Sequence, residues 1–286
     1  MKDTILSGKT TINCGGKLIS LDQPKVMGIV NCTPDSFYDG GKNNSAETAL
    51  KQIEKHLKEG ATLIDIGGYS SRPGAADVSI EEETERVVPI IKSALKEFPD
   101  LIISVDTFRS KVAKRSLDVG AMIINDISAG QLDDQMLALV INQNVPYIMM
   151  HMKHTPQNMQ NSIHYDNVLL EIGMYFSEKV SYLQSKGVKD IILDPGFGFA
   201  KDLTHNYKLL GNLNHFDFLN LPLLAGISRK SMLYKPLNIE SSQALNATTA
   251  ANMIALMNGA KILRVHDVKE AAECVHIYNL TEEYKG

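Results

Sequence analysis

Polar and charged side chains stand at the ends of eight short apolar runs in this chain. The first run, Val26–Val30, leads directly into Asn31 and the segment "CTPDSFYDGG". The later runs end at or near Asp65, Asp106, Asn125, Asp126, His151, Asp194, Ser228, Lys230, Arg264, His266 and Asp267. A buried carboxylate without a partner is costly or becomes neutral, so a convergent group of this kind needs partners. We expect a ligand to be one of them, although a purely structural pairing remains an alternative for any single residue.

The residue types fall into two chemical groups. Asp106, Asn125 and Asp194 accept hydrogen bonds, as a flat heterocycle with ring N–H and amine donors requires. A second group suits an anion such as phosphate, with Mg²⁺ as a companion ion. Its members are Asn31, Ser70, Ser71, Arg264 and His266. Lys230 fits either group, and a Schiff-base role for this lysine is the less favoured alternative.

These side chains need structural elements that bring them together. The apolar runs lie at 26–31, 62–67, 101–106, 122–127, 146–151, 190–195, 222–228 and 261–266. They are too short for helices and too continuous for half-exposed strands, which predicts parallel strands buried on both faces. Helical patterns separate the runs, and a glycine that can adopt a left-handed conformation closes four of the helices. These glycines are Gly60, Gly120, Gly187 and Gly259.

Strand–helix units repeated eight times within residues 25–280 predict an α/β fold, a (β/α)₈ TIM barrel. Residues 10–21 predict a short N-terminal β-hairpin, and we expect 1–286 to form a single domain. The alternative is an open doubly wound sheet, but no G-x-G-x-x-G motif follows the first strand. In a barrel, all strand-to-helix loops open on one face, and that face holds the active site.

The composition argues against several classes of protein. The 286 residues carry a net charge of −4 with no long basic run, which disfavours nucleic acid as a partner. No apolar stretch is long enough to span a bilayer, so we expect no membrane partner. Cys14, Cys32 and Cys274 lie far apart without a CxxC pair. We therefore expect reduced thiols in a cytoplasmic protein.

Seven motifs occur in a fixed order along the chain. They are "GIVNCTPDSFYDGG", "GGYSSRPGA", "SVDT", "INDIS", "DPGFGF", "GISRKS" and "RVHD". Together they resemble the dihydropteroate synthase family of pterin-binding barrels, over nearly the whole chain from about residue 25 to 280. Each motif alone is modest evidence, but the ordered set is specific.

The resemblance implies a reaction and a set of small-molecule substrates. In this family, 4-aminobenzoate displaces pyrophosphate from (7,8-dihydropterin-6-yl)methyl diphosphate, which gives 7,8-dihydropteroate, a folate precursor. The resemblance also implies a (β/α)₈ fold, a Mg²⁺ ion, binding of sulfonamides at the aminobenzoate site, and commonly a homodimer.

The resemblance assigns roles residue by residue. The pterin-binding positions are Asp106, Asn125, Asp194 and Lys230. Asn31 matches the metal-linked asparagine, and the diphosphate is expected to meet Asn31, Ser71, Arg264 and His266. The aminobenzoate side is expected at Ser71, Arg72, Pro73, Phe199 and Ser231. The catalytic residues are expected to be Asp106, Lys230, Arg264 and His266.

The second loop departs from the family pattern. The family commonly has Glu-Ser-Thr-Arg-Pro where this chain has Tyr69-Ser70-Ser71-Arg72-Pro73. Serine keeps the hydroxyl, whereas Tyr69 removes a charge. Two other functions stay open at this point, namely a corrinoid-linked methyltransferase barrel that binds a methylated pterin and a pterin-binding protein without activity. Anion-binding residues at Asn31, Arg264 and His266 argue against both.

Overall fold

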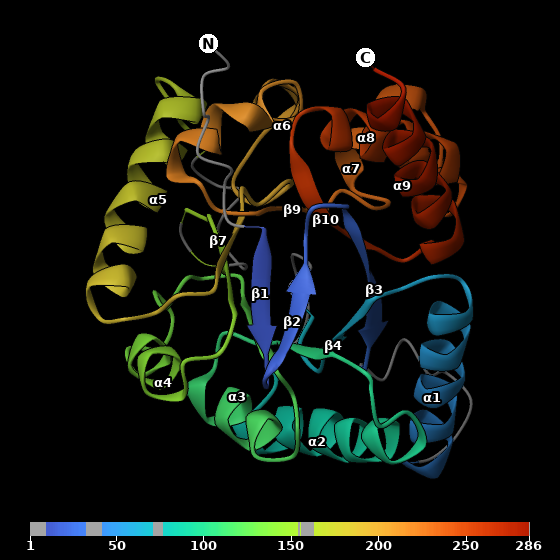
Figure 1. The fold of residues 1–286 in the computed structure, drawn as a ribbon. Coiled ribbons are helices and arrows are strands. Elements are labelled where there is room, and N and C mark those ends of the chain that lie inside the picture. The colour runs from blue at the N-terminus through green and yellow to red at the C-terminus, as the bar shows by residue number, and fades with distance from the viewer. Residues whose placement is uncertain (1–9, 33–41, 71–76, 154, 156–162, 286) are drawn as a thin grey trace.

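The chain forms a closed barrel of eight parallel strands with helices around it (Figure 1). The computed structural model describes residues 10–32, 42–70, 77–153, 155 and 163–285. The barrel strands are β3 (Lys25–Asn31), β4 (Leu63–Gly67), β5 (Ile103–Asp106), β6 (Ile123–Asp126), β7 (Tyr147–Met150), β8 (Ile191–Asp194), β9 (Leu223–Ala225) and β10 (Ala260–Val265). They pair in sequence order, and β10 closes the ring on β3. The predicted barrel is confirmed, and the open sheet is ruled out.

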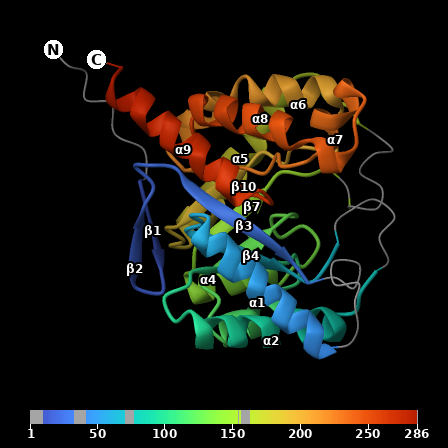
Figure 2. The ribbon, with the colours of Figure 1, turned by 90° about the vertical axis from the view of Figure 1, so that its right-hand side faces the viewer.

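Helices follow the strands and cover the outside of the ring (Figures 1 and 2). They are α1 (Lys42–Lys58), α2 (Ile80–Glu97), α3 (Ser110–Leu117), α4 (Met136–Gln143), α5 (Val168–Ser185), α6 (Leu203–Leu210), α7 (Ser231–Tyr234), α8 (Leu245–Met257) and α9 (Val268–Glu283), with 3₁₀ turns η2 (Leu213–Leu219), η3 (Lys235–Leu237) and η4 (Ser241–Gln243). Ser79 caps α2 by accepting a hydrogen bond from the Glu82 amide. In the described part of the chain, no helix is long and apolar enough to cross a membrane.

The four glycines predicted to close helices all have positive φ. The φ angles are 102° at Gly60, 110° at Gly120, 88° at Gly187 and 97° at Gly259. A side chain would be strained in this conformation, and glycine lets each helix turn sharply into the next strand. The short turns on this side leave the longer connections to the opposite end of the barrel.

The predicted hairpin consists of β1 (Thr11–Cys14) and β2 (Lys17–Ser20), and it covers one end of the barrel (Figure 2). Its buried residues Ile12 and Cys14, with Leu21, pack in one cluster with side chains from inside the ring. Those inner side chains are Met27, Leu63, Ile102, Ile123, Ile148, Ile192, Leu224 and Ile262. The barrel is therefore apolar at the end that the hairpin closes.

On β4, β8 and β10, the inner face of the barrel changes from apolar to charged two residues further along the strand. Because successive side chains alternate between faces, Leu63 and Asp65 point the same way, as do Ile192 and Asp194. The same step leads from Ile262 to Arg264 on β10. The barrel interior thus contains an apolar layer and, next to it, a layer of charged groups. The charged layer lies toward the carboxyl ends of the strands.

Candidate active site

Four side chains from four strands form a buried network inside the barrel. Arg264 donates from Nε to Asp65 Oδ2 at 2.6 Å and from Nη2 to Asp106 Oδ2 at 2.5 Å. Asn125 donates from Nδ2 to the same Asp65 oxygen at 2.9 Å. Because Nδ2 is held by Asp65, the other end of the Asn125 amide, an acceptor oxygen, is turned away from that carboxylate. The structure thus brings together Asp106, Asn125 and Arg264.

Asp65 is the member of this network for which the sequence predicted no binding role. Its side chain is fully buried, whereas those of Asp106 and Arg264 are about one-fifth exposed. It lies two residues before the end of β4, below the mouth, and serves as the anchor of the layer. The signal was present in the sequence, since an aspartate inside an apolar strand needs an internal cation.

The environment changes the proton affinity of these groups. Burial raises the pKa of Asp106 to about 7, against the lowering effect of Arg264 and with a further rise from Asp65. Burial alone would lower the pKa of Arg264, but Asp65 and Asp106 raise it above its ordinary value. Arg264 is therefore a permanent cation between two carboxylates, and Asp106 is the group that can change its charge near neutral pH.

A second subsite lies between β8 and β9. Asp194 accepts a hydrogen bond from the Gly196 amide at 2.7 Å, and Lys230 donates from Nζ to the Phe197 carbonyl. Lys230 Nζ lies 4.6 Å from the centroid of the Phe199 ring. Burial lowers the pKa of Lys230 to about 8 and raises that of Asp194, although each charge partly offsets the effect on the other. The structure thus groups Asp194, Lys230 and Phe199.

Two glycines make the "DPGFGF" loop possible. Gly196 has φ of 72°, and a Cβ there would lie 2.1 Å from the carbonyl oxygen of His151. Gly198 has φ of 79°, and its Cβ would lie 3.2 Å from Cδ of Lys230. Any side chain at Gly196 would push the loop off the end of β7. The first glycine therefore allows the loop to approach β7, and the second gives room to the Lys230 side chain.

The loops after β9 and β10 are joined on the third side of the mouth. His266 Nδ1 and Ser228 Oγ are 3.0 Å apart, which orients the imidazole. Arg229 donates to both carboxylate oxygens of Asp267 at 2.8 Å each. Arg229 directly precedes Lys230, and Asp267 directly follows His266. This bidentate pair therefore ties the two loops together next to both residues.

The remaining predicted residues are placed only in part. Asn31 ends β3 and is half-buried, and Ser231 is exposed at the start of α7, directly after Lys230. Ser71, Arg72 and Pro73 lie outside the described residues. The structure therefore does not test their expected contacts with aminobenzoate and diphosphate.

Tyr69, which stands where the family commonly has glutamate, packs in an aromatic cluster. Its ring meets Phe108 edge to face with centroids 5.1 Å apart, and the Arg109 guanidinium carbon is 5.2 Å from both rings. Arg109 also forms a 2.9 Å ion pair with the buried Glu83 of α2. Glu83 thus supplies an acidic partner to this arginine, and Tyr69 supplies packing and a cation–π contact.

Some strand-end residues have a structural role. Asp126 accepts from the Ser128 amide and hydroxyl, from the Gly130 amide and from the Tyr147 hydroxyl, each at 2.7 Å. Both of its oxygens are used inside the fold. For this residue the structural alternative is the correct one.

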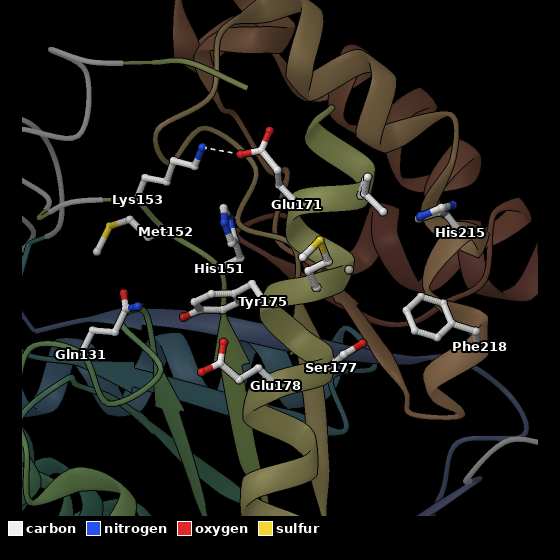
Figure 3. A pocket seen from close by; sticks show the side chains of 13 residues that line it. Gln131, His151, Met152, Lys153, Glu171, Tyr175, Ser177, Glu178, His215 and Phe218 are labelled. Atoms are coloured by element: carbon white, nitrogen blue, oxygen red, sulfur yellow. Dashed lines mark hydrogen bonds and ion pairs between the residues drawn. The ribbon is translucent and has the colours of Figure 1, made fainter. Parts of the chain in front are cut away.

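A groove of about 1050 Å³ lies along α5 on the outside of the barrel. Figure 3 shows the ion pair of Lys153 and Glu171 on one side of α5, and His215 and Phe218 on the other. Its described lining includes none of the residues that were expected to bind substrate. The candidate site at the strand ends is therefore separate from this groove.

The acidic and histidine side chains of the described chain form no group of three or more arranged to hold a metal ion. Mg²⁺ commonly takes one or two protein oxygens together with substrate phosphates. The half-buried Asn31, with an amide oxygen at the strand end, fits that mode of binding. The position of Asn31 therefore fits a Mg²⁺ ion held jointly by the protein and the substrate better than one enclosed by protein ligands alone.

Comparison with known proteins gives one consistent result. Residues 27–266 match the family model described as pterin binding enzyme. The chain is 45% identical over 268 residues to the dihydropteroate synthase of Escherichia coli K12, and the match covers 93% of this chain and 94% of that one.

Two solved structures show the same relationship. The Yersinia pestis dihydropteroate synthase with a sulfonamide drug superposes with a TM-score of 0.90 at 43% identity, over 96% of this chain and 99% of that one. The Xanthomonas albilineans enzyme in complex with 7,8-dihydropteroate gives 0.85 at 35%, over 95% and 98%. With its barrel and its layer of charged groups, this chain belongs to the dihydropteroate synthase family of pterin-binding enzymes.

Proposed function

We propose that the chain condenses (7,8-dihydropterin-6-yl)methyl diphosphate with 4-aminobenzoate and releases 7,8-dihydropteroate and pyrophosphate. One observation carries the proposal: a partly buried carboxylate, Asp106, and a buried one, Asp194, share one barrel mouth with the cations Arg264 and Lys230. Such a mouth suits a substrate with a donor-rich ring at one end and an anionic leaving group at the other.

The pterin ring is proposed to lie on Asp106, Asn125, Asp194 and Lys230. The oxygen of Asn125 is turned away from Asp65, so it can accept from the ring or its amine. Burial raises the pKa of Asp194, Lys230 and the Gly196 amide partly offset that rise, and its carboxyl oxygens are proposed to accept from the ring in the same way. Lys230 is already oriented by the Phe197 carbonyl and offers further N–H groups to an acceptor on the ring.

The difficult step is breakage of the C–O bond to pyrophosphate. An arylamine is a weak nucleophile, so we propose that departure of pyrophosphate runs ahead of attack, through a cation delocalised on the dihydropterin. Asp106 and Asp194, as carboxylates in a poorly hydrated barrel, favour that positive charge. The amine nitrogen then forms the new C–N bond and loses its proton to water or to the departing diphosphate.

The negative charge on pyrophosphate needs cations and donors. Arg264 uses two of its N–H groups on carboxylates and, with five in all, has others for an anion. His266, held by Ser228, and Asn31 are proposed to take part, together with Ser71. Mg²⁺ bound by Asn31 and the diphosphate would neutralise part of this charge. The aminobenzoate side is proposed at Ser71, Arg72, Pro73, Phe199 and Ser231.

We also propose that the chain is a single domain that works as a homodimer in the cytoplasm. Exposed apolar side chains on the adjacent helices α8 and α9 support a second copy as partner: Ile254, Met257, Ile277 and Leu280. The three cysteines are free and buried, as a reducing compartment allows. Light scattering of the purified protein and of Met257→Asp checks the dimer.

The reaction is tested by measuring pyrophosphate release from the pterin diphosphate and Mg²⁺, with and without 4-aminobenzoate. Release that depends on aminobenzoate, with 7,8-dihydropteroate formed, is the expected result. Tight pterin binding without release would contradict the proposal and favour a binding protein. Methyl transfer from a methylated pterin to a corrinoid, with indifference to aminobenzoate, would favour the methyltransferase alternative.

A further inference from the structure

A buried lysine outside the expected pterin and diphosphate positions ties two strand-end loops together. Lys201, only 3% exposed, follows the "DPGFGF" loop. Its ammonium donates to the carbonyls of Gly196 at 3.0 Å, Phe199 at 2.9 Å and His151 at 3.3 Å, and it lies 3.1 Å from Nδ1 of His151. Burial lowers the pKa of Lys201 well below its ordinary value, so the ammonium form depends on the four acceptors that surround Nζ.

His151, at the end of β7, serves as an acceptor for this ammonium. Its ring is 3% exposed and packs edge to face against Tyr175, with centroids 4.8 Å apart (Figure 3). Burial and the neighbouring Lys201 charge hold the pKa of His151 well below its ordinary value, so the imidazole is neutral. A neutral ring can present a lone pair at Nδ1 to the lysine, which gives this histidine a structural partner.

The hydrogen bonds of Lys201 to Gly196 and Phe199 lie in the loop that forms the second subsite. Gly196, whose carbonyl it holds, donates its amide to Asp194, and Phe199, whose carbonyl it also holds, packs its ring near Lys230. Between them, the Phe197 carbonyl accepts from Lys230. The Lys201 charge also counteracts the effect of burial on Asp194.

We propose that Lys201 is a positioning residue: its ammonium fixes the loop 195–200 against β7 and thereby holds Lys230, Phe199 and Asp194 in their binding arrangement. The inference rests on the proposed synthase function, because it concerns the same site. The inference predicts that substitution of Lys201 weakens ligand binding even when the variant is fully folded. Substitution of a residue needed only for stability would not weaken binding by the folded protein.

The test compares Lys201→Met with Lys179→Met. Lys179 on α5 also donates to a loop carbonyl, that of Ala129, at 2.9 Å, but that loop does not hold Lys230. For folded Lys201→Met we expect the Kd for 7,8-dihydropteroate and the KM for aminobenzoate to rise about 10- to 100-fold, since small displacements of positioning groups have effects of this size. For Lys179→Met we expect both within about twofold of the parent.

Binding of 7,8-dihydropteroate, measured by calorimetry below the unfolding transition, separates this inference from the proposed reaction. If the parent protein binds the pteroate but shows no turnover, the reaction is wrong and Lys201 is still judged by Kd. Unchanged Kd and KM in folded Lys201→Met would overturn the inference.

A second pair of variants covers the case in which Lys201→Met does not fold. His151→Leu removes the side-chain acceptor, and His151→Asn keeps an oxygen near the position of Nδ1. We expect His151→Leu to weaken pteroate binding about tenfold and His151→Asn to recover most of the loss. Equal binding by His151→Leu and the parent protein would contradict the positioning role.

Discussion

The two halves of the barrel mouth keep buried charges in different ways. On the side of β4, β5 and β10, the carboxylates Asp65 and Asp106 are held by one guanidinium from a distant strand. On the side of β8 and β9, Asp194 and Lys230 are each held by main-chain groups of a glycine-rich loop. The first arrangement is set by the register of the barrel and the second by the path of a loop.

This difference predicts different responses to substitution. Where side chains neutralise one another, removal of one leaves an uncompensated charge in the core. Where main-chain groups hold the charges, a substituted side chain has less effect on the fold. A change in the path of the loop, in contrast, removes the main-chain partners. The following variants separate the two cases.

Arg264→Met is expected to have the largest effect. It leaves the fully buried Asp65 and the partly buried Asp106 without their cation, so the free energy of unfolding should fall by about 3–5 kcal/mol. Turnover should fall more than about 100-fold. Urea unfolding and kcat/KM measure the two losses, and Arg229→Met, which breaks the more exposed pair with Asp267, is the control for the loss of stability. A fully stable Arg264→Met protein would show that the network is not neutralised as described.

Asp106→Asn should act on activity and little on stability. The amide keeps the shape and can still meet Arg264 through its oxygen, but it cannot offset the developing positive charge. We expect kcat to fall about 10²- to 10³-fold and the unfolding free energy to change by about 1 kcal/mol or less. If the variant unfolds while its folded fraction keeps the parent turnover, Asp106 has a structural role only.

Gly196→Ala tests the loop side. The new Cβ would overlap the His151 carbonyl in a backbone conformation that alanine rarely adopts, so we expect a loss of about 3 kcal/mol or more. Gly198→Ala, whose Cβ would meet only the flexible Lys230 side chain, should cost about 1 kcal/mol. Thermal unfolding measures the loss of stability in both variants. Equal losses would mean that the close approach of the loop to β7 at Gly196 is unimportant.

The pH dependence of kcat/KM should reflect both halves. Protonation removes the charge of Asp106 below its pKa of about 7, and deprotonation removes the charge of Lys230 above its pKa of about 8. The profile should therefore be a narrow bell between these values. In Asp106→Asn, measured over the same range, the acid limb should vanish and the alkaline limb remain. An unaltered acid limb would assign that proton to another group.

Tyr69→Glu should have the smallest effect. Glutamate loses the contact with Phe108 but can pair with Arg109, so gain and loss are each about 0.5–1 kcal/mol. The KM for aminobenzoate and the midpoint of unfolding should stay close to those of the parent protein. A KM raised more than about tenfold would show that Tyr69 shapes the substrate pocket directly.

The fold could be read from the sequence because its strands are buried on both faces. Apolar runs such as 62–67 and 190–195 are too short to form buried helices, and glycines such as Gly120 mark where helices stop. The approximate site followed, since parallel strand ends meet at one face. The binding and catalytic roles predicted for the strand-end residues, and those at Arg72 and Pro73, stay predictions.

The partners within the site could not be read in the same way. That Asp65 is the anchor of Arg264 depends on strand register, which composition does not fix. Nothing in the sequence around Lys201 predicts that it is buried, whereas in the fold its ammonium lies between the carbonyls of Gly196 and His151. Contacts of this kind form between segments that are distant in the sequence, and no local sequence pattern predicts them.

The bond between Arg264 and Asp65 joins residues 199 positions apart, across the seam where β10 meets β3. Asp65 and Asp106 precede Arg264 in the sequence, so their cation becomes available only when β10 pairs with β3. Non-local pairing of this kind forms late because loop closure must come first. Assembly of the pterin site therefore coincides with completion of the ring, and a ligand that binds there stabilises the finished barrel over every open intermediate.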